Sequence, residues 1–408
     1  MKGELNSLGK YSPAAIAKCG CARPFGTRTT LSTHCLTSTR KGALLTKFAF
    51  LDPMMVRRPA APKWKSPMFP GLFTLCLNVK DLAAMRRFYE ALGMKVHIDQ
   101  PKSVLLNNGD VDVALMTFLD EPCLNFRGAD PFEMHKVMTG KGLELEGKPE
   151  QYKKEKYDAD ADGRNWITRD PDGNNVFFDT NEGETGAKGY ALALQRVLDA
   201  TSKQLINVGA LQECQDAFRS KVLEKFMPSE NRAHTDLGLD TTPLTEPGKF
   251  AGSFVFCLKT TDNEATRTFY EAMGLEVTGN NDERWVQMGN GDCRFALMSL
   301  VDAYWLNFRG ADPFKVYEQM SAAGLTLEGE PARYTAEEFG SAPGAHWQTK
   351  DPDGNVVYFD TTDPELIVPG DPDALKTVLE RAHHQLLNIG AEEACLEAFQ
   401  TQILERFA

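Results

Sequence analysis

The chain has 408 residues, of which 42% are hydrophobic and 25% are charged, as in ordinary globular proteins. Its net charge of −12 is uneven: residues 1–70 carry 12 Lys and Arg against 2 Asp and Glu, and the rest carries 33 against 55. The acidic part should be repelled by phosphate backbones, so we expect no nucleic-acid partner. No stretch approaches the roughly 18 apolar residues of a membrane span, so we expect no membrane partner.

Residues 1–70 are basic, rich in Ser, Thr and Ala, and almost free of acidic residues. This composition is typical of an organelle-import segment and predicts a mitochondrial or plastid protein. The alternative is a disordered tail on a cytoplasmic protein. The nine cysteines form no CxxC pair and their number is odd, which favours buried free thiols in a reducing compartment.

From about residue 71 onward the sequence contains two similar copies of one segment, at an offset of 181 or 182 residues. The matched segments include FYEALGM and FYEAMGL (88–94 and 269–275), LNFRGADPF (124–132 and 306–314) and DPDGN (170–174 and 351–355). The chain is therefore a tandem duplication, and one fold has to explain both copies.

The first copy predicts a β-α-β-β-β order that occurs twice. The first round comprises a strand at 73–79, a helix capped by Asp81 and ended by Gly93, and strands at 95–98, 103–106 and 111–118. The second comprises a strand at 124–127, a helix at 130–140 with Pro131 in its first turn, and strands at 143–146, 165–169 and 175–180. The second copy repeats this order over residues 254–361.

A helical tail follows each copy, at 190–226 and 373–407, and we expect each to be two helices broken at Gly209 or Gly390. Such tails are typical packing or dimerisation elements. We therefore divide the chain into a leader (1–70), a first domain (71–182) with its tail (188–227), a linker rich in Pro, Thr and acidic residues (228–250), and a second domain (251–363) with its tail (372–408).

The strand ending in VKDL, the helix ending in FYEALGM and the late DPDGN turn resemble the vicinal oxygen chelate superfamily. This superfamily includes glyoxalase I, bleomycin-resistance proteins and extradiol dioxygenases such as dihydroxybiphenyl dioxygenase. The resemblance covers about 110 residues in each copy and implies an α+β fold, in which two βαβββ modules form a curled sheet around a cleft. It says less about function, because one fold hosts several reactions and also pure binders.

The superfamily usually holds a divalent metal in that cleft, and the resemblance places its ligand positions on this sequence. Three of them fall on Thr74, Cys123 and Phe177 in the first copy and on Val255, Trp305 and Tyr358 in the second, and the fourth strands offer only Asp112 and Asp292 near their starts. Because a catalytic metal needs about three suitable ligands, we predict no metal site and no cofactor. This argues against ordinary glyoxalase I and extradiol dioxygenase chemistry.

If the strands are oriented as in the superfamily, alternation places matching residues of both copies on the cleft wall. These candidate substrate-binding residues are Cys76, Asn125, Arg127 and Phe177 in the first copy and Cys257, Asn307, Arg309 and Tyr358 in the second; Asp179 and Asp360 are the candidate catalytic bases. The arginine would hold an anion by paired hydrogen bonds, the asparagine would orient the ligand and the ring would stack on it. The structural alternative is that each arginine pairs with its aspartate and that the cysteines are core residues.

The sequence thus favours a metal-free protein that binds a small anionic or aromatic molecule, as the bleomycin-resistance branch does. Whether it is an enzyme stays open: the alternatives are a metal-independent lyase, isomerase or epimerase, and a duplicated scaffold without a ligand. The four modules can pair within a copy or between copies, and the chain can be a monomer or a homodimer. Phe177 against Tyr358, and Cys123 against Trp305, indicate that the two clefts differ.

Overall fold

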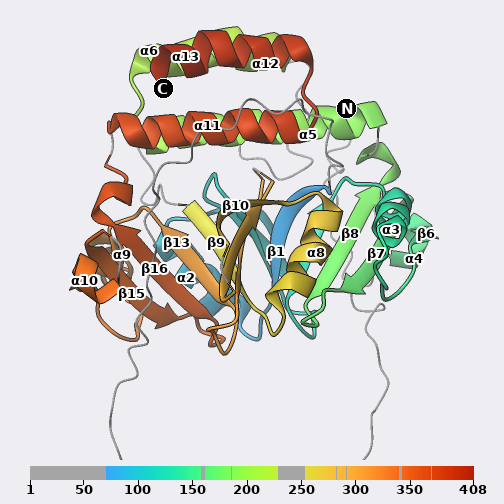
Figure 1. Cartoon of the computed structure of the whole chain (residues 1–408), viewed down its shortest axis with the longest axis horizontal. Coiled ribbons are helices and arrows are strands. Elements are labelled where there is room, and N and C mark those ends of the chain that lie inside the picture. The colour runs from blue at the N-terminus through green and yellow to red at the C-terminus, as the bar shows by residue number, and fades with distance from the viewer. Residues whose placement is uncertain are drawn as a thin grey trace, which may run out of the picture.

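The computed structural model describes residues 70–157, 161–184, 186–227, 253–281, 283–290, 292–339, 342–368 and 370–408. The predicted leader, except residue 70, and the whole predicted linker at 228–250 lie outside the described residues. The described part consists of two mixed eight-stranded sheets with their helices, topped by a separate helical layer (Figure 1). The predicted α+β class is confirmed.

Each sheet is built from one copy. Sheet A has the strand order β2-β3-β4-β1-β5-β8-β7-β6 and sheet B the order β10-β11-β12-β9-β13-β16-β15-β14. The first strands of the two modules are antiparallel neighbours in each sheet, so the modules pair within a copy and not between copies. The strands of sheet A are β1 (Leu72–Asn78), β2 (Lys95–Gln100), β3 (Ser103–Asn107), β4 (Asp112–Met116), β5 (Cys123–Arg127), β6 (Glu150–Tyr152), β7 (Gly163–Arg169) and β8 (Asn175–Asn181). Those of sheet B are β9 (Ser253–Lys259), β10 (Glu276–Asn281), β11 (Trp285–Gly289), β12 (Arg294–Met298), β13 (Trp305–Arg309), β14 (Ala332–Tyr334), β15 (Gly344–Lys350) and β16 (Val356–Thr362).

Capping residues set the ends of the longer helices in the modules. The Asp81 side chain accepts the Ala84 N–H at the start of α2 (Leu82–Leu92), and Gly93 ends that helix with a φ of 107°, a conformation that favours glycine. Asp130 caps α3 in the same way. The other helices of the modules are α3 (Pro131–Gly140), α4 (Lys154–Tyr157), α8 (Asn263–Met273), α9 (Pro313–Ala322) and α10 (Ala336–Phe339).

The strand predicted at 143–146 was wrong. That segment is a loop, and the strand at this place in the order is β6, a few residues later. Gly142 and Gly147 bracket the segment with φ values of 88° and 68°, so the backbone turns at both ends. Leu143 and Leu145 still pack on the core from this loop, which explains why their alternation resembled a strand.

Alternate strand residues face two different environments. Leu75, Phe126 and Phe178 belong to a core that includes the helices and the equivalent residues of sheet B. Cys76, Cys123 and Phe177 form a separate cluster on the opposite face of sheet A, and sheet B has a counterpart of that cluster. The predicted alternation is confirmed, and it places the candidate site residues on the face away from the helices.

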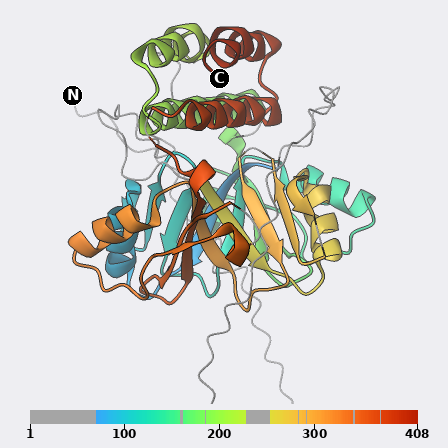
Figure 2. The ribbon, with the colours of Figure 1, turned by 60° about the vertical axis from the view of Figure 1, so that its left-hand side comes forward.

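The two copies pack through their helix-bearing faces. Helix α2 of the first copy lies against α9 of the second, and α3 lies against α8; the two views show these helices flanking the sheets (Figures 1 and 2). The Phe295 ring of sheet B contacts Phe73 and Phe126 of sheet A at centroid distances of 5.3 and 6.4 Å. The duplicated chain therefore has one shared central core.

The DPDGN turns hold the copies together. The Tyr89 hydroxyl donates to Asp351 Oδ2 at 3.1 Å, and the equivalent Tyr270 hydroxyl donates to Asp170 Oδ2 at 2.9 Å. Asp172 also accepts the backbone N–H of Thr261 at 2.6 Å in the second copy. Each turn is thus a turn first, as predicted, and in addition an anchor for the first helix of the other copy.

We expect Tyr89→Phe and Tyr270→Phe each to lower the free energy of unfolding by about 1.5 to 3 kcal/mol, because each removes a buried hydrogen bond to a carboxylate. Urea titration followed by circular dichroism measures the change. Tyr317→Phe is the matched control, since the Tyr317 ring packs on Trp347 and its loss of a hydroxyl should have little effect. Equal, small shifts for all three variants would contradict the anchoring role.

The two tails pack on each other above the sheets (Figure 1). Gly209 and Gly390, with φ values of 65° and 67°, break each tail into two arms as predicted. Both tails share one apolar core, in which the Phe218 and Phe399 rings lie 6.2 Å apart. The elements are η1 (Glu182–Glu184), α5 (Gly186–Asn207), α6 (Gln212–Phe218), η2 (Arg219–Leu223) and α7 (Glu224–Phe226) in the first copy, and η4 (Asp363–Glu365), α11 (Pro372–Asn388), α12 (Glu393–Phe399), η5 (Gln400–Leu404) and α13 (Glu405–Phe407) in the second.

Among the helices of the described residues, none has the length and apolar character that a bilayer crossing requires.

Candidate functional site

The candidate residues occupy aligned positions on three neighbouring strands of each sheet, and we call this set of residues the grid. In sheet A, Asn125 of β5 lies between Thr74 of β1 and Phe177 of β8. One step along the strands, Arg127 pairs in register with Asp179. Sheet B repeats the grid, with Asn307 beside Tyr358 and Arg309 near Asp360. The strand pairing therefore brings together the residues that the sequence placed on one wall.

Each arginine of the grid is held between two carboxylates. Arg127 contacts Asp179 at 2.5 Å and Glu184 at 2.8 Å, and all three side chains are largely buried. Arg309 contacts Asp360 at 3.0 Å and Glu365 at 2.6 Å. Two carboxylates around one guanidinium leave a formal charge of −1 when all are ionised, so these groups do not present a free cation to an anionic ligand.

A tyrosine completes each charged group. The Tyr152 hydroxyl donates to Asp179 Oδ1 at 3.3 Å, and the Tyr334 hydroxyl donates to Asp360 Oδ1 at 2.9 Å. Burial raises the pKa of both aspartates, and the neighbouring arginines oppose that rise. These tyrosines and their glutamate neighbours Glu184 and Glu365 were not among the residues predicted from the sequence. The signal that identifies them is that each pair stands at equivalent positions of the two copies.

The candidate cysteines are buried thiols. Cys76 is 0% exposed and Cys257 is 2% exposed, and burial raises the pKa of each to about 12. A thiol with this pKa is almost wholly protonated near neutral pH, so neither residue is poised as a nucleophile. Both side chains belong to the small apolar clusters on the face away from the helices.

The asparagines are the unusual members of the grid. Asn125 is fully buried, yet neither its Oδ1 nor its Nδ2 makes a hydrogen bond to the described part of the chain. Its amide lies close enough to the Cys76 thiol to oppose the rise in the thiol pKa, but the contact lacks hydrogen-bond geometry. At the equivalent place, Asn307 is 7% exposed and its Oδ1 is also unbonded. An unbonded buried polar group costs about 1 to 3 kcal/mol, so a ligand that bonded either amide within the described part of the chain would recover that cost.

The two copies differ beside these asparagines. In sheet B a run of rings crosses the face: Tyr334 to His346 at 5.9 Å, His346 to Tyr358 at 6.1 Å, and Tyr358 to Trp305 at 5.3 Å between centroids. His346 and Trp305 are only half-buried. In sheet A the positions of His346 and Trp305 hold the buried residues Asn165 and Cys123. Sheet B therefore has the accessible aromatic surface, and sheet A a closed face of smaller groups.

The residues at the family's metal positions do not fit a divalent metal. Thr74, Cys123 and Phe177 occupy three of them in sheet A. In sheet B, Val255, Trp305 and Tyr358 hold the same three positions. Asp292, which precedes β12, accepts the backbone N–H of Phe73 at 2.6 Å. Nowhere in the described ranges do three or more His, Cys, Asp or Glu side chains gather as a metal site.

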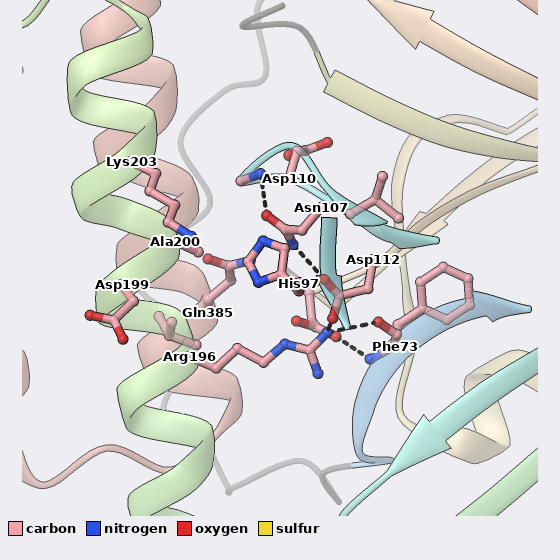
Figure 3. A pocket seen from close by; sticks show the side chains of 14 residues that line it. Phe73, His97, Asn107, Asp110, Asp112, Arg196, Asp199, Ala200, Lys203 and Gln385 are labelled. Carbon is pink, nitrogen blue, oxygen red and sulfur yellow. Dashed lines mark hydrogen bonds and ion pairs between the residues drawn. The ribbon is translucent and has the colours of Figure 1, made fainter. Parts of the chain in front are cut away.

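A small polar cavity lies where helices α5 and α11 pass over the edge of sheet A (Figure 3). Its volume is about 40 Å³. One water needs at least roughly 10 to 15 Å³ of such space, so the cavity has room for a few waters and is too small for an organic ligand. The polar groups that line it include His97, Asn107, Asp112, Arg196, Lys203 and Gln385.

Comparison with known proteins gives only remote structural similarity. No family model matches the sequence, and no curated protein does. Among solved structures, a Mn(II)-bound glyoxalase from Novosphingobium aromaticivorans aligns at 12% identity and a TM-score of 0.42, over 72% of this chain and 83% of its own. A catechol 2,3-dioxygenase aligns at 13% and 0.40, over 74% and 90%. A variant of homoprotocatechuate 2,3-dioxygenase from Brevibacterium fuscum aligns at 18% and 0.41, over 78% and 77%.

Scores this low assign no role to any residue of this chain. The strand order is the stronger observation, because each sheet joins two βαβββ modules through their first strands, which is the arrangement that the sequence resemblance implied. Each of the two tandem domains therefore has an α+β fold in which two βαβββ modules share one sheet.

Proposed function

We propose that this protein binds a small aromatic molecule on the sheet B face, in the manner of the glyoxalase-like and bleomycin-resistance-like binders. The observation that carries the proposal is the buried, unbonded amide oxygen of Asn307 beside the rings of Tyr358 and Trp305. A ligand N–H or O–H that reaches this oxygen would satisfy it, while the ligand ring stacks on the aromatic wall.

The charge of the site favours a neutral or cationic aromatic compound over a simple anion. Arg309 already has two carboxylate partners, Asp360 and Glu365, so an anion would have to displace one of them. The sequence left both anionic and aromatic ligands open. The paired carboxylates now favour the aromatic class.

We predict that the ligand binds without a divalent metal at the family's positions. Purified protein incubated with zinc, nickel, manganese or iron and then desalted should retain less than about a tenth of an equivalent per chain, because neither copy offers three ligands of suitable type. Elemental analysis measures this content. One or two equivalents retained would contradict the prediction and would make metal-dependent chemistry the leading function.

A ligand screen tests the proposal. Binding of a panel of neutral, cationic and anionic aromatic compounds is followed by tryptophan fluorescence and confirmed by calorimetry, with aliphatic carboxylates as the comparison set. We expect one ligand per chain and a preference for the neutral or cationic aromatics. Tighter binding of aliphatic anions would reject the aromatic site, and no binding by any class would leave the duplicated scaffold as the better description.

A second function, metal-independent lyase, isomerase or epimerase chemistry, is favoured by the aspartates. Burial raises the pKa of Asp360, as suits a general base. If Asp360 removes a substrate proton, kcat/KM should fall as the pH drops through that raised pKa, because the protonated carboxyl cannot accept a proton. Asp360→Asn should then abolish turnover of any substrate found in the screen. Unchanged turnover in this variant would exclude Asp360 as the base.

A further inference from the structure

Two cysteines face each other across the strand pair that joins the modules of sheet A. Cys76 of β1 and Cys123, the first residue of β5, are direct register partners in this antiparallel pair. They are 0% and 2% exposed and belong to the same small cluster on the face away from the helices. The next residue in the row is Ala114 of β4, the register partner of Cys76, so a small methyl group flanks the two thiols.

This placement meets the geometric requirement for a disulfide. Directly opposed residues of an antiparallel pair have Cα atoms about 4.5 to 5.5 Å apart, inside the range of about 4.4 to 6.8 Å that disulfides span. The side chains of such a pair also point to the same face. The second copy provides the contrast, because Cys257 faces Trp305 at the equivalent place and no disulfide can form there.

We propose that Cys76 and Cys123 are a redox site whose two thiols form a reversible disulfide between the two modules of sheet A. The oxidant is a low-molecular-weight disulfide such as oxidised glutathione. One thiolate attacks it, forming a mixed disulfide and releasing one reduced glutathione. The second thiolate attacks the protein sulfur of that mixed disulfide and releases the other, so two thiols are oxidised and one glutathione disulfide is reduced to two thiols.

The burial of the two thiols limits thiol–disulfide exchange to states in which the strand pair is open to solvent. Both thiols have pKa values raised by burial, which keeps them protonated and slow to react in the closed sheet. Cys123 directly follows a loop in which Asp120 and Glu121 are exposed, so the start of β5 is the point at which the pair can open to solvent. Oxidation should therefore be faster during refolding than in the folded protein.

The test uses the full-length chain. Reduced, unfolded protein is refolded in buffers of graded glutathione ratio, the remaining thiols are blocked with N-ethylmaleimide in denaturant, and the digested peptides are identified by mass spectrometry. We expect a peptide joining Cys76 to Cys123 to appear at a more reducing ratio than any other crosslink and to disappear on reduction. The oxidised protein should unfold at a higher urea concentration than the reduced protein.

Three variants separate this site from chance oxidation. Cys123→Ala should lose the crosslink and the oxidant-dependent shift of the urea midpoint, and Cys257→Ser should keep both. Trp305→Cys should create a second crosslink, to Cys257, in the other copy. The proposal is overturned if wild-type Cys76 and Cys123 are both blocked by maleimide at the most oxidising ratio, or if they pair with other cysteines instead of each other.

Discussion

Asp110→Ala should lower the free energy of unfolding by about 3 to 5 kcal/mol, the largest loss we expect from one substitution, because it leaves buried charges without their partner. The Asp110 carboxylate lies in the hairpin turn between β3 and β4, and its side chain is only 3% exposed. It pairs with Arg294 of sheet B at 2.8 Å and with Arg381 of helix α11. It also accepts the backbone N–H of Phe254 at 2.5 Å. One carboxylate thus joins the two sheets and a tail.

Chemical unfolding in urea measures this effect, with two further variants as controls. Asp110→Asn keeps an acceptor for Phe254 but removes the charge, so its loss should be smaller than that of Asp110→Ala. Asp216→Ala, at an exposed position of α6, should change little. Both arginine side chains are largely buried. A loss below about 1 kcal/mol for Asp110→Ala would contradict this prediction, because it would show that the two guanidiniums are well solvated without the carboxylate.

The arrangement within one copy follows from local sequence, and this is why it could be predicted. The capping aspartates, the Gly93 terminator and the alternation along β5 each act over a few residues. Their consequences, down to which of Asn125 and Phe126 faces the helices, are fixed once the strand is recognised. Even the wrong prediction of a strand at 143–146 has a local cause, since the flanking glycines have positive φ values.

The contacts between the copies have no such local signal. Asp110 meets Arg381 across 271 residues, and no periodicity reports that pairing. The duplication was the best guide to function in the sequence, but it selects residues that both copies share. Arg381 corresponds to Ala200 and His346 to Asn165, so these two residues were passed over, and Trp305 against Cys123 served only as a sign that the clefts differ. Trp305 and His346 supply two of the four rings on the sheet B face.

Trp305→Ala should therefore weaken binding of an aromatic ligand by about 10- to 100-fold, because truncating a central aromatic contact typically costs about 2 kcal/mol or more. Trp305 is the half-buried end of the ring series, 5.3 Å from Tyr358, and it stands in register beside Cys257, next to the row of Asn307. Calorimetry with the best compound of the screen measures the change.

The matched control exploits the duplication. Cys123→Ala alters the equivalent position of sheet A, which is buried and has no ring, and should leave the affinity unchanged. Tyr358→Phe keeps the ring and should cost less than Trp305→Ala. If Cys123→Ala weakens binding and Trp305→Ala does not, the ligand occupies the closed face of sheet A, and the unbonded amide of Asn125 rather than that of Asn307 is its anchor. The two equivalent asparagines thus define two alternative ligand positions. The effects of Cys123→Ala and Trp305→Ala on affinity distinguish between them.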